Sequence, residues 1–116
     1  MDKVRIGIIG VRGRGCLAEH WRDSPRAQVV GGADISDEAL RAFREAMGGD
    51  VFVAGDYRAL IERADIDAIA VTSPDFVHEE HAVAALEAGK HVFCEKPLAI
   101  TAAGCDRILR AWKKSG

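Results

Sequence analysis

Five short apolar runs alternate with amphipathic segments along the 116 residues, and this alternation limits the fold most strongly. We interpret the runs as strands over residues 4–10, 27–34, 51–53, 66–72 and 91–94. Strands that alternate with helices pair in parallel through right-handed crossovers. The sequence therefore predicts an α/β protein with a doubly wound parallel sheet, strand order 3-2-1-4-5, that ends before a sixth strand.

The intervening segments carry residues that start and stop helices. Ser36 and Asp56 are predicted N-caps, and Thr101 is expected to cap the last helix. Gly48-Gly49 and Gly89-Lys90 are expected to end the helices before them. The predicted buried stripes are Ala39, Leu40, Phe43 and Met47 in the helix after Ser36, and Val77, Val83 and Leu86 in the helix before Gly89. Leu60 and Ile61 lie on the helix after Asp56, and Cys105, Ile108, Leu109 and Trp112 give the last helix an amphipathic pattern. A first helix is expected over residues 13–22, ended by Ser24-Pro25.

Composition narrows the class of protein. A hydrophobic content of 48%, a charged content of 29% and a net charge of −2 are typical of a soluble globular domain and do not favour nucleic-acid binding. The three cysteines show no C-x-x-C spacing, so neither a disulfide framework nor a zinc site is expected. The apolar N-terminal run is too short for a membrane span. We expect a cytoplasmic protein without a membrane or nucleic-acid partner.

The first apolar run ends in clustered glycines, where a helix is predicted to begin. Glycine permits positive φ and a close approach of backbone to phosphate, and helix N-terminal amides attract anions. Gly10, Gly13 and Gly15 therefore predict a turn that binds the pyrophosphate of a dinucleotide. The G-x-G-x-x-G pattern started at Gly10 has Arg12 where its second glycine belongs. Arg12 either contacts phosphate or points to solvent.

Asp34 ends the second predicted strand, 19 positions after Gly15. At about this spacing a carboxylate accepts hydrogen bonds from the adenosine ribose of NAD. A carboxylate repels the 2′-phosphate of NADP, so NAD is favoured. Arg12 and Arg14 offer a competing cationic site, and NADP stays possible.

Three further segments bear a family resemblance. They are the loop Thr72-Ser-Pro-Asp-Phe-Val-His78, the run Ala85-Leu-Glu-Ala-Gly-Lys-His-Val92 and the tripeptide Glu95-Lys-Pro97. In this order and spacing they resemble the N-terminal NAD(P)-binding domain, a Rossmann fold, of the glucose-fructose oxidoreductase, inositol dehydrogenase and rhizopine-catabolism family. The resemblance covers essentially the whole chain.

The resemblance assigns roles to individual residues. It implies that Gly10, Arg12, Gly13, Arg14 and Gly15 surround the pyrophosphate, that Asp34, Ile35 and Ser36 meet the adenosine ribose, that Ser73, Pro74 and His78 line the cofactor groove, and that Glu95, Lys96 and Pro97 lie beside the nicotinamide. Lys96 is the expected catalytic residue, because an ammonium group can donate a hydrogen bond to the substrate oxygen during hydride transfer.

The spacing of the histidines does not indicate a metal site. His78-Glu-Glu-His81 contains H-x-E, but no P-C-x-x-C follows, and the spacing is not that of H-E-x-x-H. His20, His81 and His91 are interpreted as packing or surface residues. No metal site is predicted.

We expect residues 1–116 to form one NAD(P)-binding domain, with the C-terminal substrate domain absent from this chain. The parent protein is expected to oxidise a hydroxyl of a sugar, cyclitol or related polar substrate, and the fragment to bind cofactor with little or no turnover. A non-catalytic dinucleotide-sensing module is the alternative, and a methyltransferase a weaker one. We expect a homo-oligomer. The open sheet edge and the helix surface around Trp112 are expected to drive self-association of the fragment that the full-length protein would not show.

Overall fold

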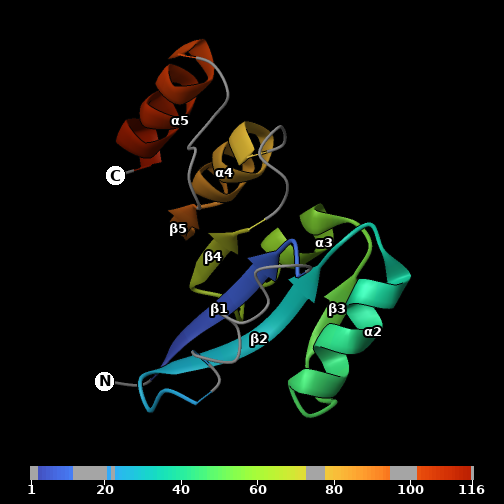
Figure 1. Cartoon of the computed structure of the whole chain (residues 1–116). Coiled ribbons are helices and arrows are strands. Elements are labelled where there is room, and N and C mark those ends of the chain that lie inside the picture. The colour runs from blue at the N-terminus through green and yellow to red at the C-terminus, as the bar shows by residue number, and fades with distance from the viewer. Residues whose placement is uncertain (1–2, 12–20, 22, 73–77, 95–101, 116) are drawn as a thin grey trace.

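The computed structural model describes residues 3–11, 21, 23–72, 78–94 and 102–115. Its strands are β1 (Val4–Ile9), β2 (Ala27–Ala33), β3 (Phe52–Ala54), β4 (Ala68–Val71) and β5 (His91–Cys94). All pair in parallel in the order β3-β2-β1-β4-β5 (Figure 1). The predicted fold class and strand order are confirmed.

Helices cover both faces of this sheet. Those described are α2 (Asp37–Ala46), α3 (Tyr57–Ile61), α4 (His78–Glu87) and α5 (Ala102–Ser115). α2 packs on β2 and β3 from one side, α3 and α4 pack on the other side, and α5 lies against α4 (Figure 1). Most of the predicted helix over residues 13–22, and the predicted cap Thr101, lie outside the described residues.

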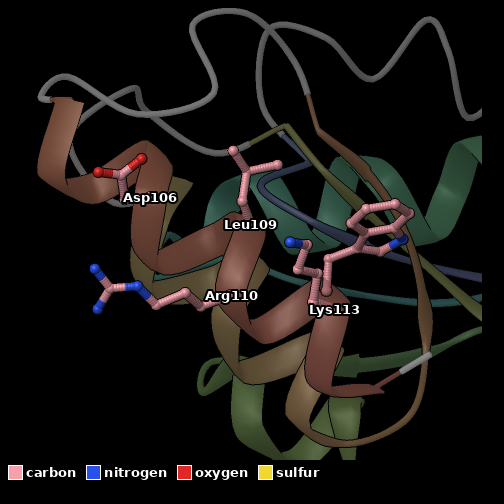
Figure 2. A pocket seen from close by; sticks show the side chains of 5 residues that line it. Asp106, Leu109, Arg110 and Lys113 are labelled. Carbon is pink, nitrogen blue, oxygen red and sulfur yellow. The ribbon is translucent and has the colours of Figure 1, made fainter.

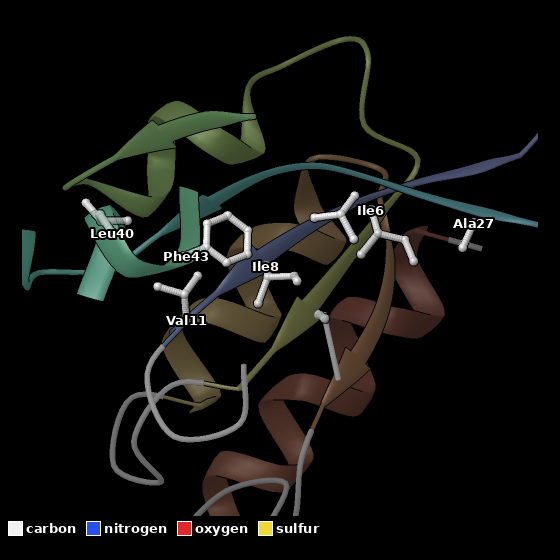
Figure 3. Close-up of a cluster of buried hydrophobic side chains, with 8 residues drawn as sticks. Ile6, Ile8, Val11, Ala27, Leu40 and Phe43 are labelled. Atoms are coloured by element: carbon white, nitrogen blue, oxygen red, sulfur yellow. The ribbon is translucent and has the colours of Figure 1, made fainter. Parts of the chain in front are cut away.

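Two clusters of buried side chains hold these layers together. The cluster beneath α2 contains Ile6, Ile8, Val11, Ala27, Val29, Leu40, Phe43 and Ala70 (Figure 3). The cluster beneath α3 and α4 contains Ile9, Ala33, Leu60, Ile61, Ile66, Ile69, Val71 and Ala85. Alternate residues of β1 enter opposite clusters, as expected for a strand covered on both faces.

A bulge in β2 sets the register at the carboxyl ends of β1 and β2. Ile6 is level with Val29 but Gly7 is level with Gly31, so β2 has one extra residue at Val30. After the bulge, Ile9 is level with Ala33. β1 and β2 therefore end together, and Asp34 follows β2 where Gly10 follows β1.

The helix boundaries follow the predicted capping chemistry. The Ser36 hydroxyl accepts a hydrogen bond from the Ala39 amide at 3.1 Å, and the Asp56 carboxylate accepts one from the Arg58 amide at 2.9 Å. Gly48 and Gly49 have φ of 92°, and Gly89 has φ of 80°. These left-handed residues end the helices before them, as predicted.

Polar side chains join the segments at the amino ends of the strands. Arg5 interrupts the apolar run of β1, and its guanidinium makes a two-point contact with the Asp67 carboxylate, at 2.9 and 3.1 Å. The Lys90 ammonium donates to the carbonyls of Arg63 at 2.8 Å and Ile66 at 2.7 Å. These contacts hold the segment that directly precedes β4 against β1 and against the segment before β5.

The structure buries only part of the apolar stripe of α5 against α4. Ile108 is 5% exposed and packs on α4, but Leu109 is 50% and Trp112 57% exposed. α5 meets α4 through the line of Ile108 and Ala111, which leaves the other half of its apolar stripe outside the contact. The buried stripe of α4 differs from the prediction. Ala82, Ala85 and Leu86 are buried, Val83 is only partly buried, and Val77 lies outside the described residues.

Strand ends differ from their predictions by one or two residues. β3 begins at Phe52, and β4 begins at Ala68, although the apolar pattern starts at Ile66. Ile66 is buried beneath α3 before pairing begins, so its hydrophobicity reflects packing and not strand structure. Within the described residues, no helix is both long and apolar enough to cross a bilayer.

Candidate functional site

The carboxyl ends of β1, β2 and β4 bring Gly10, Asp34 and Thr72 together. The Gly10 amide donates to the Ala33 carbonyl at 2.8 Å, and the Thr72 amide donates to the Ile9 carbonyl at 2.9 Å. β1 lies between β2 and β4. The strand order therefore reverses direction at β1: β2 and β3 follow on one side of it, and β4 and β5 on the other. Ligands of doubly wound folds bind at such a switch point.

Gly10 has φ of 85°, a conformation that side-chain-bearing residues rarely adopt. It is buried directly after β1 and turns the chain toward residues 12–15, which lie outside the described residues. The first glycine of the predicted phosphate turn is thus required by the backbone itself. Its place beside the pyrophosphate stays a prediction.

The Asp34 carboxylate is held by two backbone amides. Its Oδ2 accepts a hydrogen bond from Val11 N at 3.1 Å, and its Oδ1 accepts one from Ser36 N at 2.9 Å. A carboxylate has about four acceptor positions, and the described residues occupy one on each oxygen. Asp34 is only half-buried.

Ile35 and Ser36, the two residues after Asp34, have different structural roles. The Ile35 side chain is 96% exposed and provides an apolar surface beside the carboxylate. The Ser36 hydroxyl caps α2, so its side chain serves the helix while its amide serves Asp34. Of the three residues predicted to meet the ribose, Asp34 thus has the geometry of an acceptor, and Ser36 supports it.

Thr72 was not among the predicted site residues, although it opens the loop motif that was recognised. Its side chain is buried, and its Oγ1 lies 2.5 Å from the Gly10 carbonyl oxygen and 3.3 Å from that of Ile9. A polar residue at the end of a buried strand was the signal that could have identified it. The hydroxyl connects β4 to the glycine turn.

The remaining predicted site residues fall in segments outside the described part of the chain. These are Arg12, Gly13, Arg14, Gly15, Ser73, Pro74, Glu95, Lys96 and Pro97. His78 begins α4, and only its backbone is described. The structure therefore brings together Gly10, Asp34, Ile35 and Ser36, and the other assignments stay predictions.

His81 is a packing residue, as predicted. It is buried on α4, and its ring stacks on Tyr57 with centroids 4.3 Å apart and the planes tilted by 54°. The Tyr57 hydroxyl donates to the Glu80 carboxylate at 2.8 Å. Burial, and next the hydrogen bond to Glu80, raise the pKa of Tyr57 above its ordinary value. This cluster joins α3 to the start of α4.

A surface hollow lies along the outer side of α5. Figure 2 shows Asp106, Leu109, Arg110 and Lys113 projecting from successive turns of this helix, and Trp112 also lines the hollow. All the described lining residues come from α5, and none from the ends of β1, β2 or β4. We place the candidate site at the strand ends, where backbone amides of Val11 and Ser36 converge on Asp34.

Residues 4–116 match the model of a family described as an oxidoreductase family with an NAD-binding Rossmann fold. An inositol 2-dehydrogenase of Klebsiella pneumoniae subsp. pneumoniae is 44% identical over 97% of this chain and 34% of its own length. The chain thus spans about a third of the length of the curated relatives it matches.

Solved structures agree with this match. A probable dehydrogenase from Thermotoga maritima is 35% identical, with a TM-score of 0.90 over 97% of this chain and 34% of that one. A 3-ketoreductase from Actinomadura kijaniata, solved with NADP, is 32% identical, with a TM-score of 0.86 over 98% of this chain and 36% of that one. The likeness extends across the described sheet and its helices.

Proposed function

Because the chain belongs to the oxidoreductase family with an NAD-binding Rossmann fold, we propose that it is the cofactor-binding part of an NAD(P)-dependent dehydrogenase. The parent enzyme would act on a hydroxyl of a sugar, cyclitol or related polar substrate. The observation that carries this proposal is the Asp34 carboxylate, held at the switch point by one described backbone amide on each of its oxygens.

The described residues suit a dinucleotide. Asp34 would accept the two hydroxyl groups of the adenosine ribose, and Ile35 would lie against the adenine side of that sugar. Gly10 would direct the chain so that Arg12, Gly13, Arg14 and Gly15 surround the pyrophosphate. Ser73, Pro74 and His78 would line the groove toward the nicotinamide.

NAD is the proposed preference, with NADP a possible second cofactor. The Asp34 carboxylate is fixed by two amides and cannot swing away without losing both hydrogen bonds. A 2′-phosphate would therefore bring its negative charge against a fixed negative charge. Arg12 and Arg14 would have to offset that repulsion for NADP to bind well.

Bound NAD supplies the hydride acceptor, and this chain supplies the groups around it. Lys96 would donate a hydrogen bond to the substrate oxygen and stabilise the alkoxide character that develops there. Glu95 and Pro97 would lie beside the nicotinamide and hold Lys96 in place. The relative named inositol 2-dehydrogenase supports a polyol as the substrate class.

The proposed substrate domain would follow residue 116 in the parent protein. Relatives about three times as long as this chain support that arrangement. Residues 1–116 alone would then bind cofactor but turn over little or no substrate. Self-association through the exposed side of α5 also stays a prediction, which light scattering at several concentrations can test.

Calorimetric titration of the 116-residue chain with NAD, NADP and S-adenosylmethionine tests the cofactor assignment. Saturable binding of NAD, with weaker binding of NADP, is expected. Binding of S-adenosylmethionine alone would favour the methyltransferase alternative. In the parent protein, NAD-dependent oxidation of a polyol that is lost in Lys96→Ala supports an enzyme, whereas tight cofactor binding without turnover supports the sensing module.

A further inference from the structure

The peptide unit between Gly10 and Val11 is held from both sides of β1. Its carbonyl oxygen lies 2.5 Å from the hydroxyl of Thr72, the residue that directly follows β4. Its amide donates to Asp34 Oδ2, which follows β2, at 3.1 Å. One planar unit at the start of the glycine turn is therefore connected to both neighbouring strands.

Geometry decides which carbonyl the Thr72 hydroxyl serves. A hydroxyl has one proton to donate, and the Gly10 oxygen lies 0.8 Å nearer to it than the Ile9 oxygen at 3.3 Å. The Ile9 carbonyl already receives the Thr72 backbone amide in the sheet ladder. The hydroxyl thus extends the contact between β1 and β4 by one residue, beyond the last ladder bond and into the turn.

Because a peptide unit is planar, a bond to its carbonyl also restrains its amide. Donation from Thr72 polarises the peptide and strengthens the hydrogen bond from Val11 N to Asp34. Thr72 is buried, with 8% of its surface exposed, so water does not readily replace its hydroxyl. Glycine at position 10 has φ of 85° and little steric restraint of its own.

We propose that Thr72 is a positioning residue for the cofactor: it fixes the Gly10–Val11 peptide and, through it, both the glycine turn and the Asp34 carboxylate. This inference rests on the proposed cofactor function. Thr72 would act on the cofactor through this peptide, whose carbonyl it contacts and whose amide contacts Asp34.

Thr72→Val keeps the shape of the side chain and removes the hydroxyl, whereas Thr72→Ser keeps the hydroxyl. The Kd for NAD is expected to rise about tenfold in Thr72→Val, as for the loss of one hydrogen bond, and to change less than about threefold in Thr72→Ser. Thr72→Cys, with a weak donor of similar size, gives an intermediate Kd and serves if the valine variant does not fold.

Lys90→Met is the matched control, since it removes hydrogen bonds to the carbonyls of Arg63 and Ile66 at the opposite end of the sheet. It should lower Tm and leave the Kd for NAD unchanged when titrated well below Tm. An unchanged Kd in Thr72→Val, or an equal rise in Lys90→Met, would overturn the proposal.

Amide hydrogen exchange of the cofactor-free protein separates this inference from the proposed function. Thr72→Val should speed exchange at Val11 at least tenfold, with little change at Ile8, and Thr72→Ser should restore protection. If the wild-type chain binds neither NAD nor NADP, the proposed function fails, and exchange at Val11 still decides whether Thr72 holds the turn. Unchanged exchange there contradicts the inference.

Discussion

Asp34 accepts a hydrogen bond from the Val11 amide at 3.1 Å, across 23 positions of sequence, and so joins the end of β2 to the beginning of the glycine turn. The same carboxylate accepts the Ser36 amide at 2.9 Å. The residue proposed to bind the ribose therefore also holds the backbone at the start of the proposed phosphate turn. Changes at Asp34 should affect both.

We expect Asp34→Asn to weaken NAD binding by about 10- to 100-fold, since a hydrogen bond to a charged group contributes about 1.5–3 kcal/mol. NADP binding should fall less, because the charge that repels its 2′-phosphate is removed. Calorimetric titration with both cofactors measures the ratio. Asp37→Asn, in the exposed first turn of α2, is the control and should leave both affinities unchanged. Equal losses in the two variants would contradict the assignment.

Gly31→Ala should destabilise the fold by about 1–3 kcal/mol, the usual cost of overpacking. A Cβ at Gly31 would lie 2.7 Å from the Phe52 carbonyl oxygen, a backbone atom held in the β2–β3 pairing. Gly55→Ala is the control, because nothing lies within 4 Å of its added Cβ. Urea unfolding measures both variants. A loss at Gly55 as large as that at Gly31 would show that close packing is not the cause.

Acid should weaken the connection between β1 and β4. Hydrogen bonds from the Arg5 side chain, then from its backbone amide, lower the pKa of Asp67 from 3.8 to about 2. A lowered folded-state pKa means that the stabilisation is present in full above the ordinary pKa and is lost as the pH falls through about 2. The free energy of unfolding should therefore decrease between about pH 4 and pH 2.

The variant Asp67→Asn tests this assignment in urea titrations at a series of pH values. It should be less stable than the wild type at neutral pH and show a shallower decline in acid. Some decline remains, since hydrogen bonds from Arg63 and Arg107 lower the pKa of Asp65 and Glu79 in the same direction. Asp50→Asn, in the exposed loop before β3, should keep the full decline. An equally steep decline in Asp67→Asn would exclude Asp67 as its source.

Adjacent residues of α5 should respond very differently to truncation. Ile108→Ala empties a buried position against Ala82 and Leu86 and should cost about 2–5 kcal/mol. Leu109→Ala removes a half-exposed side chain and should cost about 1 kcal/mol or less. Thermal and urea unfolding compare the pair. Similar losses would mean that α5 is rotated about its axis relative to the structure described.

Much of the fold could be predicted because the signals are local. Ser36, Asp56 and the glycines after α2 and α4 act on backbone groups within a few residues, so capping is readable without a partner. The β1 and β5 ranges follow from apolar runs bounded by turns. Ile66 misled the prediction of β4, since a buried residue before a strand has the same hydrophobicity as one within it.

The site was predictable in part for the same reason. Gly10 and Asp34 stand at the ends of strands, where spacing alone indicates a dinucleotide turn and its acidic partner. Thr72 could not be assigned, because its hydroxyl matters only once β4 lies beside β1 in the correct register. The exposure of Leu109 could not be assigned either, because an apolar stripe does not say how much of it a neighbouring helix covers.

The sequence by itself thus determined the order of elements, their caps and the family motifs, since periodicity and capping depend on residues close together in the chain. Tertiary structure decided the rest. Packing between distant segments set the bulge at Val30, the face of α5 that is buried, and the hold of Thr72 and Asp34 on the Gly10–Val11 peptide. Such contacts depend on register and rotation, which only the packed molecule defines.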